Sequence, residues 1–454
     1  MSSLSLVPRV GLARRMDNLL PQPTGFASRP GAAQVIAGSV TQCWSFGQSL
    51  VFVRDGHLWL WDGFGEADLG AVPAALTATG FDALATNARR ESRLYLGALG
   101  VPLFYIDATG AARHPATNSV LDAAGVPYPV PRAGVLTTFR GRVWTADGNR
   151  LHHCEFDAAG TWDPLYTVEL QTGRPDAIRA ALPVGEALVV ALGRSIWSIT
   201  GDSQYNWQRS LLLDGRGVVG PQALTSDGSR AFYLSTTGLY QLGESDPVTD
   251  TLDELWRVPD PWASLLLDPS GRWLLVLAQG RLLAWDTRQQ RCGEIVAPQA
   301  RGVFAHANRL GWYGRDGVWL LGDEDAPDVQ ADGRSTPVES LFEGWDEAPN
   351  PLGRAVLARS TLAVMASTTA QVSYAVQVDG VDSPVQTRTI GRSTGLHTWR
   401  GDLPDTAPVS QTIEFPVHRA GTQFRHRLTG AGPLDVRGLA PRYQFGELKE
   451  VSGE

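Results

Sequence analysis

The side chains best suited to chemistry in this chain form a run of three potential metal ligands. His152, His153 and Cys154 follow one another directly. Because neighbouring residues of a strand point to opposite faces, His152 and Cys154 share one face and His153 takes the other. The three side chains therefore do not converge, and we expect ordinary strand residues here rather than a metal centre.

Other signatures of catalysis or metal binding are missing from the sequence. The cysteines are odd in number, lie far apart and match no zinc-binding spacing: Cys43, Cys154 and Cys292. There is no Gly-x-Ser-x-Gly elbow, phosphate loop, His-Glu-x-x-His helix or repeated aspartate box. The sequence thus predicts a protein that is not an enzyme, with no catalytic, cofactor-binding or metal-binding residues. A tightly bound metal would contradict this and would point to His152 with Cys154, or to Asp323 with Asp325.

Several isolated carboxylates stand beside expected turns: Asp202, Asp214 and Asp253. Aspartate is favoured at turns because its side chain hydrogen-bonds the nearby backbone. These positions therefore predict turn capping rather than acid–base catalysis.

Acidic residues concentrate in one segment, residues 323–347. It contains nine carboxylates against Arg334, and its sum of −8 equals the formal net charge of the whole chain. The nine are Asp323, Glu324, Asp325, Asp328, Asp332, Glu339, Glu343, Asp346 and Glu347. Such runs are typical of a solvated linker. The functional alternative is a wall that repels a polyanion such as DNA.

Basic residues give little sign of nucleic-acid recognition. Lys449 is the one lysine, and the arginines are scattered rather than gathered in the dense patch that DNA binding requires. The N-terminal arm is a mild exception, because four arginines against one aspartate give it a charge of +3: Arg9, Arg14, Arg15, Arg29 and Asp17. This charge suits a grip on an acidic neighbouring subunit.

A glycine-centred hairpin recurs along most of the chain and must position any site. Its turn glycines are separated by 37 to 48 residues and flanked by short apolar runs: Gly56, Gly100, Gly148, Gly193, Gly238, Gly280 and Gly317. A period of this length built from short strands indicates β-propeller blades. Seven repeats predict an all-β, seven-bladed propeller.

The side-chain pattern predicts that each sheet is covered on both faces. In residues 58–61 the leucines point one way and the tryptophans the other, yet both sets are apolar. We expect the last blade, residues 302–322, to be completed by a strand from 34–38 or from 337–342, because closure removes a sheet edge. The longest apolar runs are too short to span a bilayer, so no membrane insertion is expected.

Four parts follow from these patterns. Residues 1–32 form an extended N-terminal arm, 33–322 the propeller, 323–347 the acidic linker and 348–454 a C-terminal β domain. In the last part, Ala370–Val378 alternates apolar and polar residues and precedes a turn, which indicates a small β-sandwich.

Several stretches resemble a known family. They include Gly141-Arg142-Val143-Trp144 and Gly160-Thr161-Trp162-Asp163, then residues 195–201, 215–221 and 232–240, and the opening Gly11-Leu12, Asp17-Asn18 and Arg29-Pro30-Gly31. Together these resemble the β-propeller tail proteins of short-tailed bacteriophages, the nozzle or tail tubular protein B group that includes packaged-DNA stabilisation proteins. The likeness covers roughly residues 8 to 245.

The resemblance implies a structural protein of the virion that is assembled in the bacterial host cytoplasm and located in the phage tail. It implies a homo-oligomeric ring, with a hexamer favoured, next to a portal or adaptor ring and to tail fibre or needle proteins. The ring lines the channel through which double-stranded DNA passes without sequence-specific binding, and it helps to retain and eject the genome.

Two other roles remain open for this sequence. A tail-tip or baseplate hub protein of a longer-tailed phage uses the same scaffold with a different symmetry. A carbohydrate-binding propeller places tryptophan pockets at matching loop positions, whereas the tryptophans here lie within strand runs.

Overall fold

The structure is a computed structural model, and it describes most of the chain. The described residues are 13–17, 19–22, 25–29, 31–73, 75–84, 90–98, 101–107, 112–132, 134–170, 173, 175–248, 263–268, 270–288, 290–297, 299–322, 328–330, 334–336, 338–347, 355–366, 370–390, 409–421, 423–432 and 435–445. Every regular element among them is a β-strand, which confirms the all-β prediction. In this part of the chain no helix is long and apolar enough to cross a membrane.

The chain divides into two compact units. Unit 1 contains residues 1–34, 291–296 and 321–454, and unit 2 contains residues 35–290 and 297–320. The unit boundaries cut across the expected parts, because the N-terminal residues belong with the C-terminal ones.

Unit 2 is a succession of small antiparallel sheets. The first two are β5 (Val40–Phe46), β6 (Ser49–Arg54), β7 (His57–Trp61) and β8 (Glu66–Ala71), then β9 (Thr77–Leu84), β10 (Arg90–Gly97), β11 (Phe104–Asp107) and β12 (Arg113–Pro115). The next two are β13 (Leu136–Phe139), β14 (Arg142–Asp147), β15 (Arg150–His153) and β16 (Thr167–Glu169), then β17 (Ile178–Val184), β18 (Ala187–Leu192), β19 (Ser195–Thr200) and β20 (Gln208–Asp214). The remaining strands are β21 (Leu224–Ser226), β22 (Ala231–Ser235) and β23 (Gly238–Gln241), β24 (Ser264–Leu267), β25 (Trp273–Ala278) and β26 (Arg281–Asp286), and β28 (Ala300–His306), β29 (Arg309–Gly314) and β30 (Gly317–Leu321).

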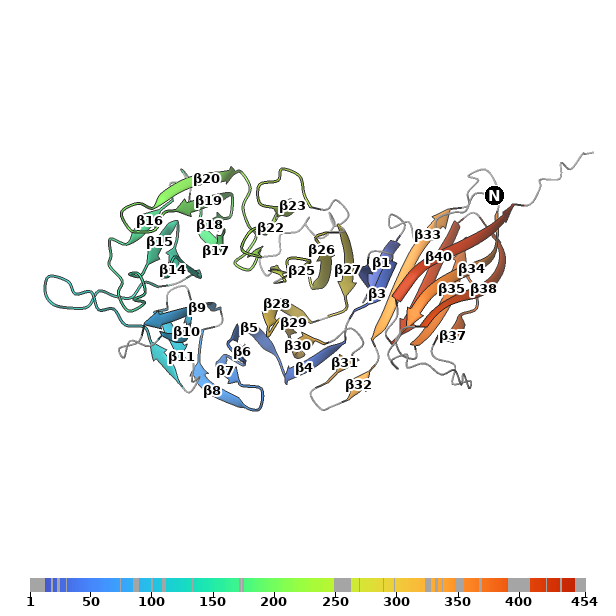
Figure 1. Cartoon of the computed structure of the whole chain (residues 1–454), viewed down its shortest axis with the longest axis horizontal. Helices are drawn as coiled ribbons and strands as arrows, with labels where there is room; N and C mark the ends of the chain where they lie inside the picture. The colour runs from blue at the N-terminus through green and yellow to red at the C-terminus, as the bar shows by residue number, and fades with distance from the viewer. Residues whose placement is uncertain are drawn as a thin grey trace, which may run out of the picture. The chain divides into compact units, whose positions relative to one another are not determined.

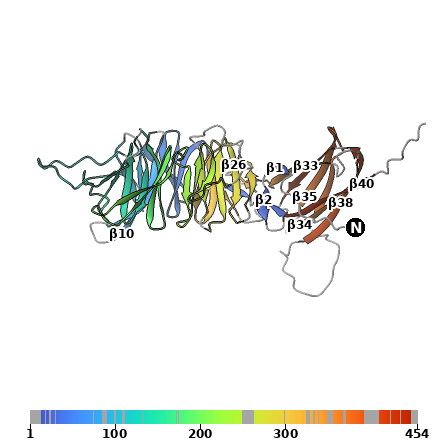
Figure 2. The same ribbon diagram turned by 90° about the horizontal axis from the view of Figure 1, so that it is seen from above.

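These sheets follow one another around a ring, as Figure 1 shows for unit 2. The first strand of one sheet contacts the first strand of the next, in the order β9, β13, β17, β21, β24, β28 and β5. Between β5 and the sheet that begins at β9, the Gln42 side-chain amide donates to the carbonyl of Leu76 (2.6 Å) and accepts from its N–H (2.7 Å). Figure 2 shows the strands of unit 2 running across the thickness of this ring. The sheets therefore have the arrangement of propeller blades.

The first three sheets of unit 2 are covered on both faces by apolar side chains, as the alternation predicts. On β10, Leu94 and Leu96 pack with β6 and β7 of the preceding sheet, whereas Tyr95 packs with β13 and β14 of the next. On β7, Leu58 and Leu60 join the core shared with β10, and the tryptophans between and after them join the core on the opposite face. This confirms the prediction made from residues 58–61.

A strand from near the N-terminus is added to the last sheet. Strand β4 (Ala32–Ala37) lies next to β30 in the sheet that begins with β28. Ile36 is 1% exposed and shares a core with Val318 and Leu320. Two segments are expected from the sequence to complete this sheet, and the segment 34–38 is the one whose strand is added to it. Residues 339–342 of the other segment belong to a strand of unit 1.

Unit 1 is built from two sheets that share one core. The first contains β27 (Arg291–Ile295), β1 (Ala13–Asp17), β33 (Glu339–Glu347), β39 (Gln423–Ala431), β35 (Ala370–Val378), β36 (Val381–Asp382) and β37 (Gln386–Ile390). The second contains β2 (Leu19–Gln22), β3 (Gly25–Ser28), β40 (Asp435–Phe445), β34 (Ala355–Ala366) and β38 (Val409–Gly421). Buried side chains from β34, β38 and β40 pack against those of β35, β37 and β39.

Two expected parts take a different form. Residues 339–347 of the acidic segment are not a linker but strand β33, which pairs along its whole length with β39 and along part of it with β1. The described part of the N-terminal arm is likewise paired, because β1 lies between β27 and β33 and β3 pairs with β40. Two further short strands, β31 (Asp328–Val329) and β32 (Ser335–Thr336), also come from the acidic segment.

Candidate functional site

The sheet β13–β16 carries a cluster of aromatic side chains around His153. The His153 ring stacks on Tyr166 (centroids 5.2 Å apart) and lies 4.5 Å from Trp144 and 5.7 Å from Trp207. The side-chain Nε1–H of Trp207, from the loop between β19 and β20, donates to His153 Nε2 (3.0 Å). The cluster therefore joins two neighbouring sheets of unit 2.

The histidine–cysteine run has a structural role in this cluster. Burial lowers the pKa of His153 to about 4, so its ring is neutral and accepts the hydrogen bond from Trp207. Cys154 is fully buried in the core on the opposite face, where burial raises the pKa of its thiol to about 12. His153 and Cys154 thus point to opposite faces, as expected. No group of three histidine, cysteine or acidic side chains within the described ranges is placed to hold a metal ion.

Arg142 lies beneath the surface next to this cluster. Its side chain is 4% exposed, and Nη1 donates to the carbonyls of Arg140 and Asp202 (both 3.1 Å). The guanidinium carbon lies 5.4 Å from the Phe156 ring centroid and 5.6 Å from that of Trp207. Because a buried cation is stabilised by aromatic faces and carbonyls, Arg142 holds the loops on both sides of it together.

A carboxylate next to Arg142 joins the same network. The Tyr166 hydroxyl donates to Glu155 Oε2 (2.6 Å), and this hydrogen bond lowers the pKa of Glu155 and raises that of Tyr166 to about 12. The N–H of Phe156 also donates to Glu155 (2.9 Å). Glu155 is therefore ionised and fixes the loop that carries Phe156.

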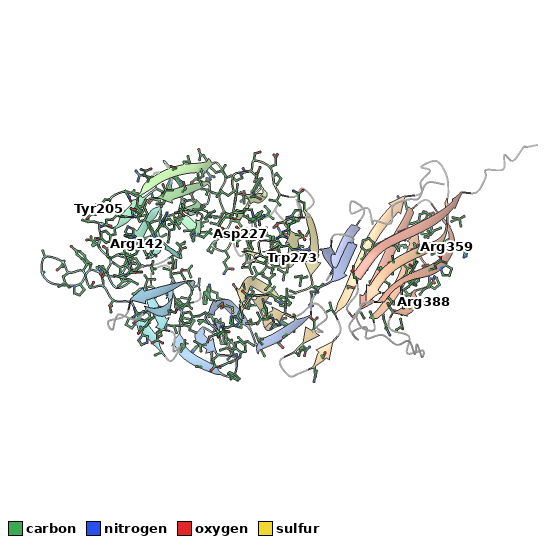
Figure 3. All side chains as sticks on the ribbon, viewed as in Figure 1. Arg142, Tyr205, Asp227, Trp273, Arg359 and Arg388 are labelled. Atoms are coloured by element: carbon green, nitrogen blue, oxygen red, sulfur yellow. The ribbon has the colours of Figure 1, made fainter. Side chains whose placement is uncertain are left out.

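Three large apolar side chains stand out from the loops above this network. Phe156 is 56% exposed, Leu165 83% and Tyr205 89%. The first two lie between β15 and β16 and the third between β19 and β20, so all three belong to loops that join the third and fourth strands of neighbouring sheets. Figure 3 labels Arg142 and Tyr205, which lie near one another in this view of unit 2. We call Phe156, Leu165 and Tyr205 the exposed patch.

The turns that carry the exposed patch are fixed by hydrogen bonds. Asp163 Oδ1 accepts from the N–H of Leu165 (2.8 Å). Asn206 Oδ1 accepts from the N–H groups of Asp202 (3.0 Å) and Ser203 (2.9 Å), which closes the loop under Tyr205. Aspartate and asparagine often stabilise turns in this way. Asp202 is expected from the sequence to cap a turn, but here Asn206 is the capping residue, and the Asp202 carboxylate accepts from the Asn206 side-chain amide (2.7 Å).

The ionisable groups around the exposed patch are mainly acidic. They are five carboxylates against two arginines: Glu155, Asp157, Asp163, Glu186, Asp202, Arg140 and Arg142. Glu186, 85% exposed, pairs with Arg140 across the two sheets. Large exposed apolar groups on fixed turns are typical of protein-interaction sites, and here the surround is negative.

The remaining predicted residues are placed as follows. Arg29 is not available to a neighbouring subunit, because it is 4% exposed and forms two hydrogen bonds of 2.8 Å with Asp328 within unit 1. The same pair neutralises one of the nine carboxylates assigned to the acidic segment. Asp214 caps its own turn through Gly215 (2.9 Å). Other expected positions lie outside the described residues or have undescribed side chains: Arg9, Arg14, Arg15, Asp17, Asp253, Asp323, Glu324, Asp325, Asp332, Glu339, Glu343, Asp346, Glu347 and Lys449.

Sequence reasoning did not find the exposed patch. Its residues come from loops 40 residues apart, and a single exposed leucine or tyrosine in a turn carries no signal. The turn residues Asp163 and Asn206 are visible in the sequence, but they do not show which side chains the turns expose.

Comparisons with known proteins give no family. No protein-family model matches the chain, and no curated protein matches it. Among solved structures it is similar to the extracellular domain of a one-component system from B. thetaiotaomicron, at 11% identity and a TM-score of 0.42, covering 69% of this chain and 41% of that one. It is also similar to the AfRom2 CNH domain, at 10% identity and a TM-score of 0.43, covering 64% and 99%.

A third similar structure is PorZ, a surface component of the type-IX secretion system of Porphyromonas gingivalis. The identity is 12% and the TM-score 0.31, covering 71% of this chain and 44% of that one. The chain spans about two fifths of the length of the first of these relatives and of PorZ. At these scores the likenesses carry no argument about function.

Proposed function

We propose that this chain is a structural protein of a bacteriophage virion, a component of the tail nozzle or head-to-tail connector. Its copies form a ring, six in number by analogy with the family it resembles, next to the portal or adaptor ring and to tail fibre or needle proteins. The ring lines the exit channel for double-stranded DNA and helps to retain and eject the genome. The role is structural, without catalysis.

The observation that carries this proposal is the sheet built by the most family-like stretch. Residues 141–163 form its hairpin and the turn that follows, in which Trp162 is 2% exposed. The Asn118 side chain accepts from the Trp162 N–H (2.9 Å) and donates to its carbonyl (2.8 Å). The Gly-Thr-Trp-Asp stretch that supports the resemblance is thus an anchor within the fold.

We also propose that unit 2 is a seven-bladed propeller. Several of the predicted turn glycines lie between the second and third strands of a sheet: Gly56, Gly148, Gly193 and Gly280. Gly238 and Gly317 begin third strands, and Gly100 lies outside the described residues. The repeat read from the sequence and the succession of sheets therefore have the same period.

Electron cryomicroscopy of the phage particle that contains this chain tests the proposed role. We expect density for the chain in a ring on the tail axis, next to the head, and we expect particles made without it to lose their packaged DNA. Density at the distal end of a long tail would instead assign the chain to a tail-tip or baseplate hub. Complete absence from the particle would reject the virion role.

A further inference from the structure

We propose that the exposed patch binds residues 1–12 of a second copy of this chain. The inference deepens the proposed ring and rests on it, because it names the contact that links one copy to the next. It depends on three observations: the exposure of the patch, its negative surround and the chemistry of the N-terminal residues.

The side chains of the exposed patch are already fixed in the unbound chain, as those of a preorganised binding surface are. Phe156, Leu165 and Tyr205 are held out on turns that are already hydrogen-bonded. Binding to fixed side chains costs less conformational entropy than binding to mobile ones. Gly141 adds to this fixation, because a Cβ at that position would lie 2.6 Å from the Phe156 ring, so the glycine leaves room for it.

The N-terminal residues are complementary to this surface. Their apolar side chains recur at short intervals: Leu4, Leu6, Val7, Val10 and Leu12. They carry Arg9 and are followed by Arg14 and Arg15, and no carboxylate occurs before Asp17. The composition of this segment, apolar and basic, is thus complementary to an apolar surface surrounded by carboxylates, and opposite charges favour and orient such a contact.

The contact joins two different surfaces and is therefore heterologous. Contacts of this kind produce closed rings when the rotation between copies allows closure. Twelve residues in extended form reach about 40 Å, which is enough to cross to a neighbour. The same segment bound within its own chain would leave the protein monomeric, so the oligomeric state separates the two cases.

The first test compares the assembly of full-length variants by sedimentation velocity. We expect Leu165→Ser combined with Tyr205→Ser to raise the concentration needed for assembly by roughly tenfold or more, as loss of central interface side chains does. Phe64→Ser is the matched control, because Phe64 is 100% exposed on a loop of the same type in another sheet. Circular dichroism checks that all variants are folded.

The second test mixes two variants that fail for different reasons. Leu4→Asp with Leu6→Asp damages the segment and leaves the patch intact, whereas the serine pair damages the patch and leaves the segment intact. A heterologous contact predicts that the mixture forms pairs that grow no further, since one intact contact remains per pair. Unchanged assembly of the serine pair, no pairs on mixing, or a wild-type chain that stays monomeric would each overturn the inference. Rings formed through another surface would leave the proposed virion role standing.

Discussion

Three buried polar side chains form a hydrogen-bonded chain inside unit 1. Ser360 Oγ lies 2.7 Å from the Tyr374 hydroxyl, which lies 2.6 Å from His426 Nδ1. All three residues are at most 4% exposed. Burial lowers the pKa of His426 to about 4. Charging His426 would place a cation out of reach of water inside this network, so burial favours the neutral ring in the folded chain.

This network predicts that acid destabilises unit 1. The pKa of His426 is about 4 in the folded chain and about 6.5 when unfolded, so below pH 6.5 the unfolded state binds the proton more readily. The stability of the folded chain that depends on a neutral His426 is fully present above pH 6.5 and is lost as the pH falls towards 4. The loss in the free energy of unfolding from this residue is about 3 kcal/mol. Calorimetry across this range should show that the free energy of unfolding depends less on pH in His426→Gln than in the wild type. An unchanged pH dependence of the free energy of unfolding in His426→Gln would contradict the assignment.

The ion pair between Arg29 and Asp328 predicts a second residue-scale effect. Asp328 Oδ1 also accepts from the N–H of Ala32 (2.7 Å), so one carboxylate fixes both a buried guanidinium and the start of β4. We expect Asp328→Asn to lower the free energy of unfolding by about 2 kcal/mol. Glu414→Gln, which removes the partly exposed pair with Arg359, should cost under about 1 kcal/mol. Equal losses in chemical denaturation would show that the Asp328 pair is no better than a surface pair.

At the level of elements, strand β4 predicts how the ring of sheets is held closed. It lies next to β30 in the last sheet, and its Ile36 belongs to the core between the last sheet and the first. Deleting residues 1–38 should therefore expose that core and lower the melting temperature of unit 2 by several degrees or prevent its folding. Deleting residues 1–12 should leave the melting temperature of unit 2 unchanged at a concentration where the chain is monomeric, because the contact proposed for these residues is with a second copy. Equal melting temperatures for both deletions would mean that β4 does not support closure.

The elements show what the sequence can predict and what it cannot. Short apolar runs around glycine turns predict hairpins well, because turn chemistry and alternation are local properties. The dense charge of residues 339–347 predicts a linker and outweighs their strand pattern, and for this segment the prediction is wrong. That segment becomes β33 through pairing with β39, more than 75 residues later in the sequence, and such distant pairing leaves no local signal. The exposed patch escaped prediction for the same reason, since two loops of different sheets create it.

At the scale of the whole molecule, the sparse basic charge predicts weak binding to DNA. The chain has a net charge of −8 and one lysine, and several arginines of unit 2 are committed to carboxylates or aromatic rings, as Arg272 is to Asp286 (2.9 Å) and Trp273 (4.7 Å). A protein that lines a DNA channel must avoid phosphate contacts, because each one adds affinity that slows passage. The isolated chain should therefore show no sub-micromolar binding to duplex DNA at physiological salt in a fluorescence anisotropy titration. Tight binding that weakens steeply as salt is added would show a DNA-gripping surface and would contradict the proposed role of the channel wall.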